Sequence, residues 1–78
     1  MEKIKDFEKA QLFIKGWAKH WEIRIKNIEI ENNRYLSVEF CKHEAFSTRM
    51  LRELDAVFEY VLILHRCDLL CMAIYLNQ

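Results

Sequence analysis

The sequence contains almost none of the residues that loops and linkers use, with no proline and one glycine among its 78 residues. Glycine and proline are the strongest local breaks in helices and strands. We therefore expect regular structure to fill the chain from end to end, without linkers or repeats. A length of 78 residues predicts a single domain.

Residues 2–21 predict an amphipathic helix. Its apolar side chains recur at helical spacing and would form one buried stripe: Phe7, Ala10, Ile14, Trp17, Ala18 and Trp21. Two interpretations of Gly16 stay open. The glycine lies inside the helix at a cost of about 1 kcal/mol relative to alanine, or it ends the helix as the residue after the C-cap.

Residues 22–42 predict a β-hairpin. Ile23 and Ile25 alternate in one phase, whereas Ile28 and Ile30 alternate in the other. A strand with a period of two residues cannot change phase without an extra residue, so we expect a β-bulge near Lys26-Asn27. The turn falls at Asn32-Asn33-Arg34, because asparagine tolerates a positive φ.

A three-residue loop sets the register of this hairpin. It aligns three apolar pairs: Ile30 with Leu36, Ile28 with Val38 and, across the bulge, Ile25 with Phe40. The opposite face would carry Glu29, Glu31, Tyr35, Ser37 and Glu39. A two-residue loop would mix the two sets, which favours the longer loop.

Residues 44–76 predict a long helix, in one piece or broken near His65–Asp68. The first half has an apolar stripe made by Met50, Leu51, Leu54, Val57, Phe58 and Val61. After Tyr60 a second stripe begins on the opposite side. Two interpretations of the polar break stay open: His65 and Asp68 form a buried pair, or Asp68 caps a new helix. The expected fold is α+β in the order α-β-β-α, a two-stranded antiparallel hairpin packed by an N-terminal helix and a long C-terminal helix.

The second stripe predicts an interface, since a helix that is apolar on both sides is buried on both sides. Its residues are Ile63, Cys67, Leu70 and Ile74. Domains this small bury little surface alone, and a two-stranded hairpin leaves two open edges. We therefore expect a homodimer formed through residues 60–76.

The polar face of the hairpin is the candidate surface for a different partner protein. Its residues are Glu29, Glu31, Tyr35 and Glu39. The expected function is that of a small interaction module, an adaptor, inhibitor or regulator. The small size and the many lysines, isoleucines and asparagines are typical of microbial or phage accessory proteins.

Nucleic-acid binding is the alternative function. Basic residues at Lys15, Lys19, Arg24 and Lys26 alternate with tryptophans, as in proteins that bind single strands. Against this, the net charge is zero and the tryptophans belong to the predicted core stripe.

No motif indicates an enzyme, and we expect no catalytic residues and no cofactor. With one glycine, the chain has no phosphate-binding loop and no turn that would expose a nucleophile. A zinc site would need Cys41, His43, Cys67 and Cys71, but no Cys-x-x-Cys pair occurs. Burial as small apolar side chains explains the cysteines better, so we expect no metal.

The cysteine number and the N-terminal sequence favour a reducing compartment, and we expect a cytoplasmic protein. Three cysteines cannot all pair, and residues 1–6 contain no apolar leader segment. The most apolar stretch, residues 56–76, is interrupted by Glu59, His65, Arg66 and Asp68. Charges at the centre of a membrane span are strongly penalised, so we expect no membrane segment.

Overall fold

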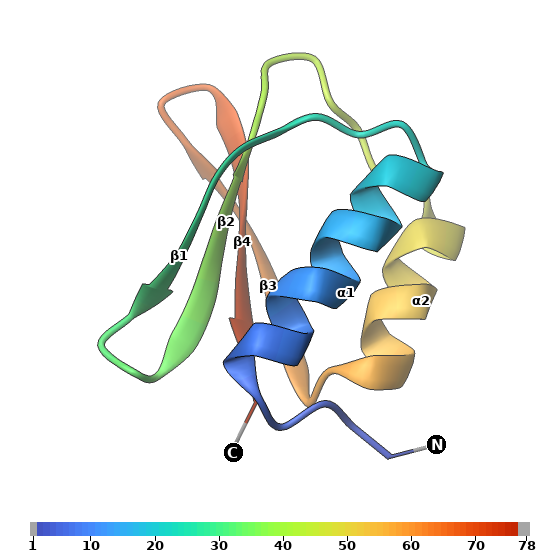
Figure 1. The fold of residues 1–78 in the computed structure, drawn as a ribbon. Coiled ribbons are helices and arrows are strands. Elements are labelled where there is room, and N and C mark those ends of the chain that lie inside the picture. Colours follow the sequence, from blue (N-terminus) through green and yellow to red (C-terminus); the bar gives the residue numbers. More distant parts are fainter. Residues whose placement is uncertain (1, 77–78) are drawn as a thin grey trace.

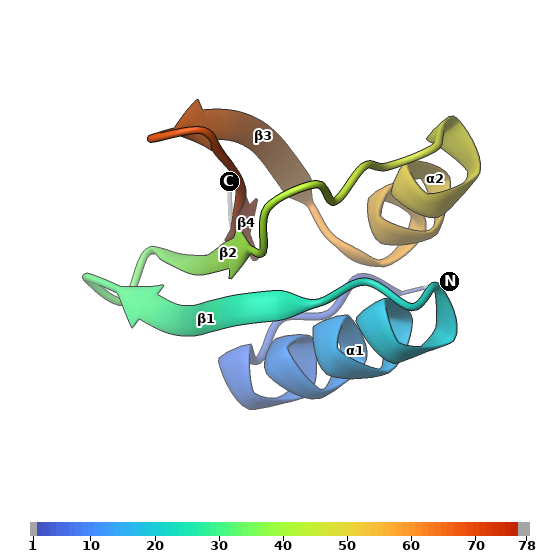
Figure 2. The same cartoon turned by 90° about the horizontal axis from the view of Figure 1, so that it is seen from above.

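Residues 2–76, which the computed structural model describes, form two helices and four strands (Figure 1). In chain order the elements are α1 (Phe7–His20), β1 (Ile25–Glu31), β2 (Tyr35–Phe40), α2 (Thr48–Val57), β3 (Tyr60–Arg66) and β4 (Leu69–Tyr75). The strands form one antiparallel sheet in the order β1-β2-β4-β3. Both helices lie on the same side of the sheet, with α1 near β1 and α2 near β3 (Figure 2).

Helix α1 agrees with the apolar stripe seen in the sequence. Asp6 caps the helix by accepting a hydrogen bond from the Glu8 backbone N–H at 3.2 Å. The residues that α1 buries are Ala10, Ile14, Trp17 and Ala18. Gly16 lies inside the helix, and a Cβ atom added there would meet nothing within 4 Å. The first interpretation of this glycine is therefore confirmed.

The β1–β2 hairpin is confirmed in detail. Ile30 pairs with Leu36, and Ile25 pairs with Phe40 across a bulge between Ile25 and Asn27. The loop holds three residues, and both of its asparagines have a positive φ, 52° and 56°. Asparagine occupies this left-handed region at lower cost than most side chains, which explains the tight reversal.

The predicted long C-terminal helix is wrong, and with it the order α-β-β-α. The α+β class is confirmed, but the observed order is α-β-β-α-β-β. Helix α2 begins after Ser47, whose side chain accepts a hydrogen bond from the Met50 backbone N–H at 3.3 Å. The helix ends at Val57, and Phe58 is already extended with ψ 146°. No helix formed by residues 2–76 is both long enough and apolar enough to cross a membrane.

A tight turn replaces the predicted polar break in the last helix. Cys67 and Asp68 have φ values of 51° and 65°, and Arg66 pairs directly with Leu69. Two central residues with positive φ define a type I′ turn, whose twist matches that of a hairpin. Both hypotheses for this segment are wrong, because His65 and Asp68 are exposed and Asp68 starts no helix.

Strand β4 explains why residues 69–75 are extended. It inserts between β2 and β3 and covers the edge of β2 that a two-stranded hairpin would leave open. Its side chains on the helix side, Met72 and Ile74, are almost fully buried. Burial of each large apolar side chain contributes about 1.5–3 kcal/mol relative to exposure.

The core lies between the sheet and the two helices. Its largest fully buried side chains are Phe40, Phe58, Ile14, Leu36, Leu54, Met72, Ile74, Leu76 and Val38. Trp17 links the helices, because its indole Nε1 donates to the Met50 carbonyl oxygen at 3.1 Å. Its ring also packs against Phe40, with centroids 6.3 Å apart. The helix side of the sheet is thus covered by the two helices, whereas no helix covers the opposite side.

Candidate interaction surface

The face of the sheet opposite the helices carries every second residue of each strand, and we call it the outer face. No other segment within residues 2–76 forms a layer over it (Figure 2). By register its members are Asn27, Glu29, Glu31, Tyr35, Ser37, Glu39, Leu69, Cys71, Ala73, Tyr75, Tyr60, Leu62, Leu64 and Arg66. The four residues predicted to contact a partner protein all belong to this face. Strands β4 and β3 extend it beyond the hairpin seen in the sequence.

Three tyrosines gather at one end of the outer face. Tyr75 lies between the other two, with ring centroids 5.2 Å from Tyr35 and 5.6 Å from Tyr60. Tyr60 is the most open of the three, with 46% of its surface exposed. A tyrosine ring gives a rigid apolar surface with a hydroxyl at its tip, which suits protein interfaces.

A small hollow of about 70 Å³ lies beside the tyrosines. Its floor is made by Cys71 and Ala73, which are only 6% and 5% exposed although no helix covers this side. The larger side chains around them, Leu62, Leu64 and Tyr35 among them, form the walls. The hollow could accept the end of an aliphatic side chain.

The Cys71 thiol is not suited to chemistry. Burial raises its pKa above the ordinary value, and the nearby Glu39 carboxylate raises the pKa further. A thiol that stays protonated is a poor nucleophile and a poor metal ligand. We therefore assign Cys71 to the floor of the hollow.

Charge divides the outer face into two halves. The β1–β2 half is acidic, with Glu29, Glu31 and Glu39. Asn27 donates to the Glu29 carboxylate through its side-chain amide at 2.9 Å. The β4–β3 half is apolar up to Arg66 at its far end. A peptide laid across the outer face from β3 to β1 would contact apolar side chains first and carboxylates next.

The four residues of the predicted dimer stripe lie in different places, because the helix that joined them is absent. Ile63 is 36% exposed on strand β3, and Cys67 is exposed in the turn. Leu70 is half-buried on the helix side, and Ile74 is fully buried in the core. Of these four residues, only Ile63 and Cys67 are exposed to solvent.

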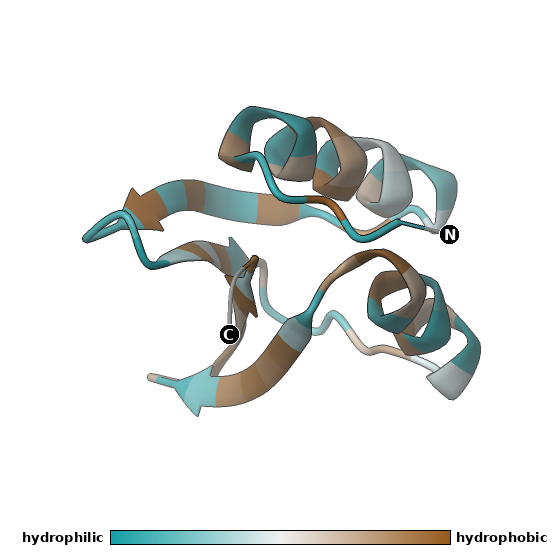
Figure 3. Cartoon of the chain, turned by 90° about the horizontal axis from the view of Figure 1, so that it is seen from below, coloured by the Kyte–Doolittle hydropathy of each residue, from teal (hydrophilic) through white to brown (hydrophobic). Residues whose placement is uncertain are grey.

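Strand β3 is instead the most exposed apolar element. The described part of the chain has five exposed large apolar residues, and three of them lie on β3: Tyr60, Ile63 and Leu64. Figure 3 shows β3 hydrophobic over most of its length, whereas β1 alternates between hydrophobic and hydrophilic bands. As the last strand of the sheet, β3 also has one unpaired side. The β-branched and aromatic residues of this segment could have indicated a strand from the sequence, but its position at the edge depends on the strand order.

The predicted nucleic-acid patch does not form one exposed basic and aromatic surface. Arg24 is held by Glu44, whose Oε1 accepts from the Arg24 backbone N–H at 2.9 Å and from Nε at 3.1 Å. These bonds hold the pKa of Glu44 below its ordinary value, the backbone bond having the larger effect. Lys15 and Lys19 are exposed on α1, and Lys26 lies in the β1 bulge.

The tryptophans of that patch are not free to stack on bases. Trp17 is buried in the core. Trp21 is half-buried, and its Nε1 donates to Glu53 Oε1 at 2.6 Å. Stacking of bases on aromatic rings needs an accessible ring face.

The residues of the zinc hypothesis are not brought together. Cys41 and His43 follow β2, Cys67 lies in the β3–β4 turn, and Cys71 pairs with Glu39 in the sheet. Within residues 2–76, no three side chains of the metal-binding types gather in one place. All three cysteines are free thiols.

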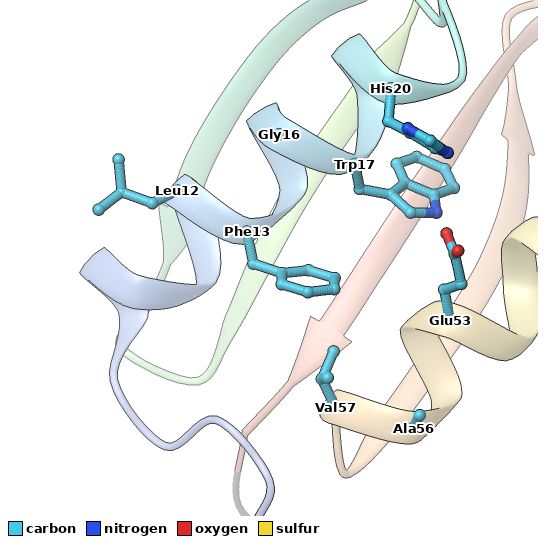
Figure 4. Close-up of a pocket in the computed structure, with 8 residues that line it drawn as sticks. All are labelled: Leu12, Phe13, Gly16, Trp17, His20, Glu53, Ala56 and Val57. Carbon is cyan, nitrogen blue, oxygen red and sulfur yellow. The ribbon is translucent and has the colours of Figure 1, made fainter.

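A second concave surface lies between α1 and α2. This open groove of about 580 Å³ is lined mostly by apolar side chains, and Leu12 at its rim is 70% exposed (Figure 4). Its polar groups are His20 and Glu53, and the Glu53 carboxylate already accepts the Trp21 bond. Nothing in the groove resembles a nucleophile with its base. Sequence reasoning missed this groove, since it needs the packing of two helices.

Comparisons with known protein families, with curated proteins and with solved structures found no match to this chain.

Proposed function

We propose that this protein is an interaction module that binds a basic and apolar segment of another protein on the outer face of its sheet. Through this contact it would act as an adaptor, inhibitor or regulator. The observation that supports the proposal is the division of the uncovered outer face into an acidic half and an apolar half.

The two halves define the partner's chemistry. Aliphatic side chains would contact the tyrosines and enter the hollow above Ala73. Full burial of one such side chain contributes about 1.5–3 kcal/mol. Lysine or arginine side chains would then reach Glu29 and Glu31, which adds charge complementarity and speeds association.

The same charges argue against a nucleic acid on this face, because the three glutamates would repel phosphates. The size of the hollow argues for a protein partner rather than a small metabolite, because about 70 Å³ is too small for most ligands. The three free thiols suit a reducing compartment, so we place this activity in the cytoplasm.

A displayed library of twelve-residue linear peptides would test the proposal directly. The immobilised protein should select peptides that combine aliphatic and basic residues, and their affinities would be measured by fluorescence anisotropy. The double variant Glu29→Lys with Glu31→Lys should weaken binding at least tenfold. Leu64→Ser, which removes a wall of the hollow, should also weaken it.

The matched control reverses two carboxylates elsewhere on the surface, Glu8→Lys with Glu22→Lys. Both glutamates are exposed and lie outside the sheet, and the change in net charge is the same. The control should keep the affinity of the wild-type protein. Equal weakening by both double variants, or a failure to select any peptide, would contradict the proposal.

A further inference from the structure

We infer that the free edge of β3 binds β3 of a second copy of this chain. The two strands would run antiparallel, with Ile63 opposite Ile63 of the second copy. The four-stranded sheet of each copy would continue into one sheet with twice as many strands. The contact is made by the backbone edge of β3 and only borders the outer face that would hold the peptide, so the inference goes beyond the proposed function.

The turn after β3 determines which backbone groups point to the free edge. Arg66 and Leu69 are the first and last residues of the turn, and these positions hydrogen-bond each other. In an antiparallel ladder the direction of these bonds alternates along the strand. The backbone N–H and C=O of Leu64 therefore point towards β4, as at Arg66. Those of Val61, Ile63 and His65, the edge-facing residues, point away from the sheet.

The edge-facing residues select a single register. With Ile63 at the centre, Val61 lies opposite His65 of the second copy, and all three edge-facing residues bond to one another. A shift by two residues would pair one of them with Glu59 or Cys67, which lie outside β3. A shift by one would oppose edge-facing groups to groups already bonded to β4.

The side chains agree with this register on both faces. On the outer face Leu62 would meet Leu64 of the second copy, and Tyr60 would meet Arg66. A guanidinium beside a tyrosine ring is a favourable cation–π contact. On the helix side the exposed Ile63 side chains would meet each other. No two charges of the same sign would face each other across the strands.

The opposite edge of the sheet fits a second copy poorly. Strand β1 is interrupted by the bulge after Ile25, and its outer face carries Glu29 and Glu31. Bulges and charges are the features by which natural edge strands avoid pairing. Pairing of β3 with β1 of another copy would place these carboxylates beside Leu62 and Leu64. It would also generate an open filament instead of a closed dimer.

Solution mass tests the inference first. Light scattering during size-exclusion chromatography, with reducing agent, should give twice the mass of the 9.5 kDa chain. Ile63→Lys would place a charge in the contact and should raise the dimer dissociation constant about a hundredfold or more. The matched control is Ile30→Lys. Ile30 is the corresponding isoleucine on β1, with 42% exposure against 36%, and its variant should remain a dimer.

Single cysteines test the register. Residues that hydrogen-bond across antiparallel strands have Cα atoms about 5.5 Å apart, within reach of a disulfide. In a background without the three native cysteines (Cys41→Ser, Cys67→Ser and Cys71→Ala), Ile63→Cys should therefore cross-link two copies on oxidation. Leu62→Cys and Leu64→Cys should not cross-link, because residue 62 of one copy lies opposite residue 64 of the other and each variant has a cysteine at only one of the two positions.

A mass of one chain at all concentrations would overturn this inference and leave peptide binding on the outer face untouched. A dimer that survives Ile63→Lys, or that cross-links through Leu62→Cys, would overturn it as well. Failure of peptide selection by a protein that is dimeric through β3 would reject the proposed function alone.

Discussion

The two edge strands of the sheet have the same length and very different surfaces. β1 and β3 each contain seven residues, and each presents one exposed isoleucine on the helix side, Ile30 and Ile63. β1 has a bulge and charged residues at alternate positions of its outer face. β3 has no bulge, and Arg66 at its end is its only lysine, arginine, aspartate or glutamate.

This difference shows that edge protection is a property of each strand and not of the sheet. An apolar, regular and unpaired strand is a template for pairing with another chain. β1 is protected by its own sequence, so it can face water in every state of the protein. β3 lacks that protection and needs a partner strand, which we assign to a second copy.

The largest effect should come from proline at two neighbouring positions of β3. Leu64→Pro removes an N–H that points towards β4, so the free energy of unfolding should fall by about 2 kcal/mol or more. Ile63→Pro removes an edge-facing N–H and should cost the monomer less than about 1 kcal/mol. It should nevertheless abolish dimerisation.

Urea denaturation at a protein concentration below the dissociation constant of the dimer would measure both values, since association itself adds stability. Similar losses of unfolding free energy for the two proline variants would mean that the backbone N–H groups of Ile63 and Leu64 do not point in opposite directions. The free edge of β3 would then not be available for pairing as we describe.

The second test makes β1 resemble β3. Glu29→Leu with Glu31→Leu removes the charges from the outer face of β1 and leaves the bulge. We expect species heavier than the dimer in light scattering, at concentrations where the wild-type protein shows none. If the double variant stays dimeric, the bulge alone is enough to protect this edge.

The third test concerns the turns next to each edge. Cys67 and Asp68 adopt positive φ without glycine, whereas the β1–β2 loop uses two asparagines. Replacing Cys67-Asp68 by Asn-Gly should raise the free energy of unfolding by about 1 kcal/mol, because these residues favour a type I′ turn. Thermal unfolding followed by circular dichroism would measure the gain. Asn33→Gly should give a smaller one.

The smallest effect should be the pH dependence of the stability that the Arg24–Glu44 pair, just before β1, contributes. The pKa of Glu44 is lowered by the Arg24 backbone N–H and then by its guanidinium. Its contribution to stability is therefore present above the ordinary pKa of 4.5 and is lost as the pH falls through the lowered value. Glu44→Gln should reduce the acid dependence of unfolding in that range. An unchanged dependence of unfolding on acid pH would mean that the Arg24–Glu44 pair does not stabilise the β1 edge.

The sequence was sufficient for the first half of the fold because its signals there exclude alternatives. The opposed phases of Ile25 and Ile28 require a bulge, and only a three-residue loop keeps Ile30 opposite Leu36. The polar hairpin face was predicted by the same register. Its extension by β4 and β3 could not be predicted, since it depends on a strand order set by packing.

Residues 60–76 were misassigned because short apolar runs fit a helix and a buried strand equally well. Val61–Leu64 and Leu69–Ile74 carry no alternation of polar and apolar residues. The turn between them contains Cys67-Asp68, not the asparagine and glycine that mark most two-residue hairpins. The β-branched and aromatic residues of β3, such as Tyr60, Val61 and Ile63, were the signal that favoured a strand.

The division of the outer face has a consequence for partner choice once two copies are joined. Pairing at β3 brings the two apolar halves together at the centre and leaves carboxylates at both ends of the long sheet. Two identical sites would then lie on the same face of the long sheet, one on each side of the twofold axis. A partner with two basic segments in tandem would engage both, and its second contact would form at a high effective concentration. Avidity would thus favour repeated or dimeric partners, even where each single contact is weak.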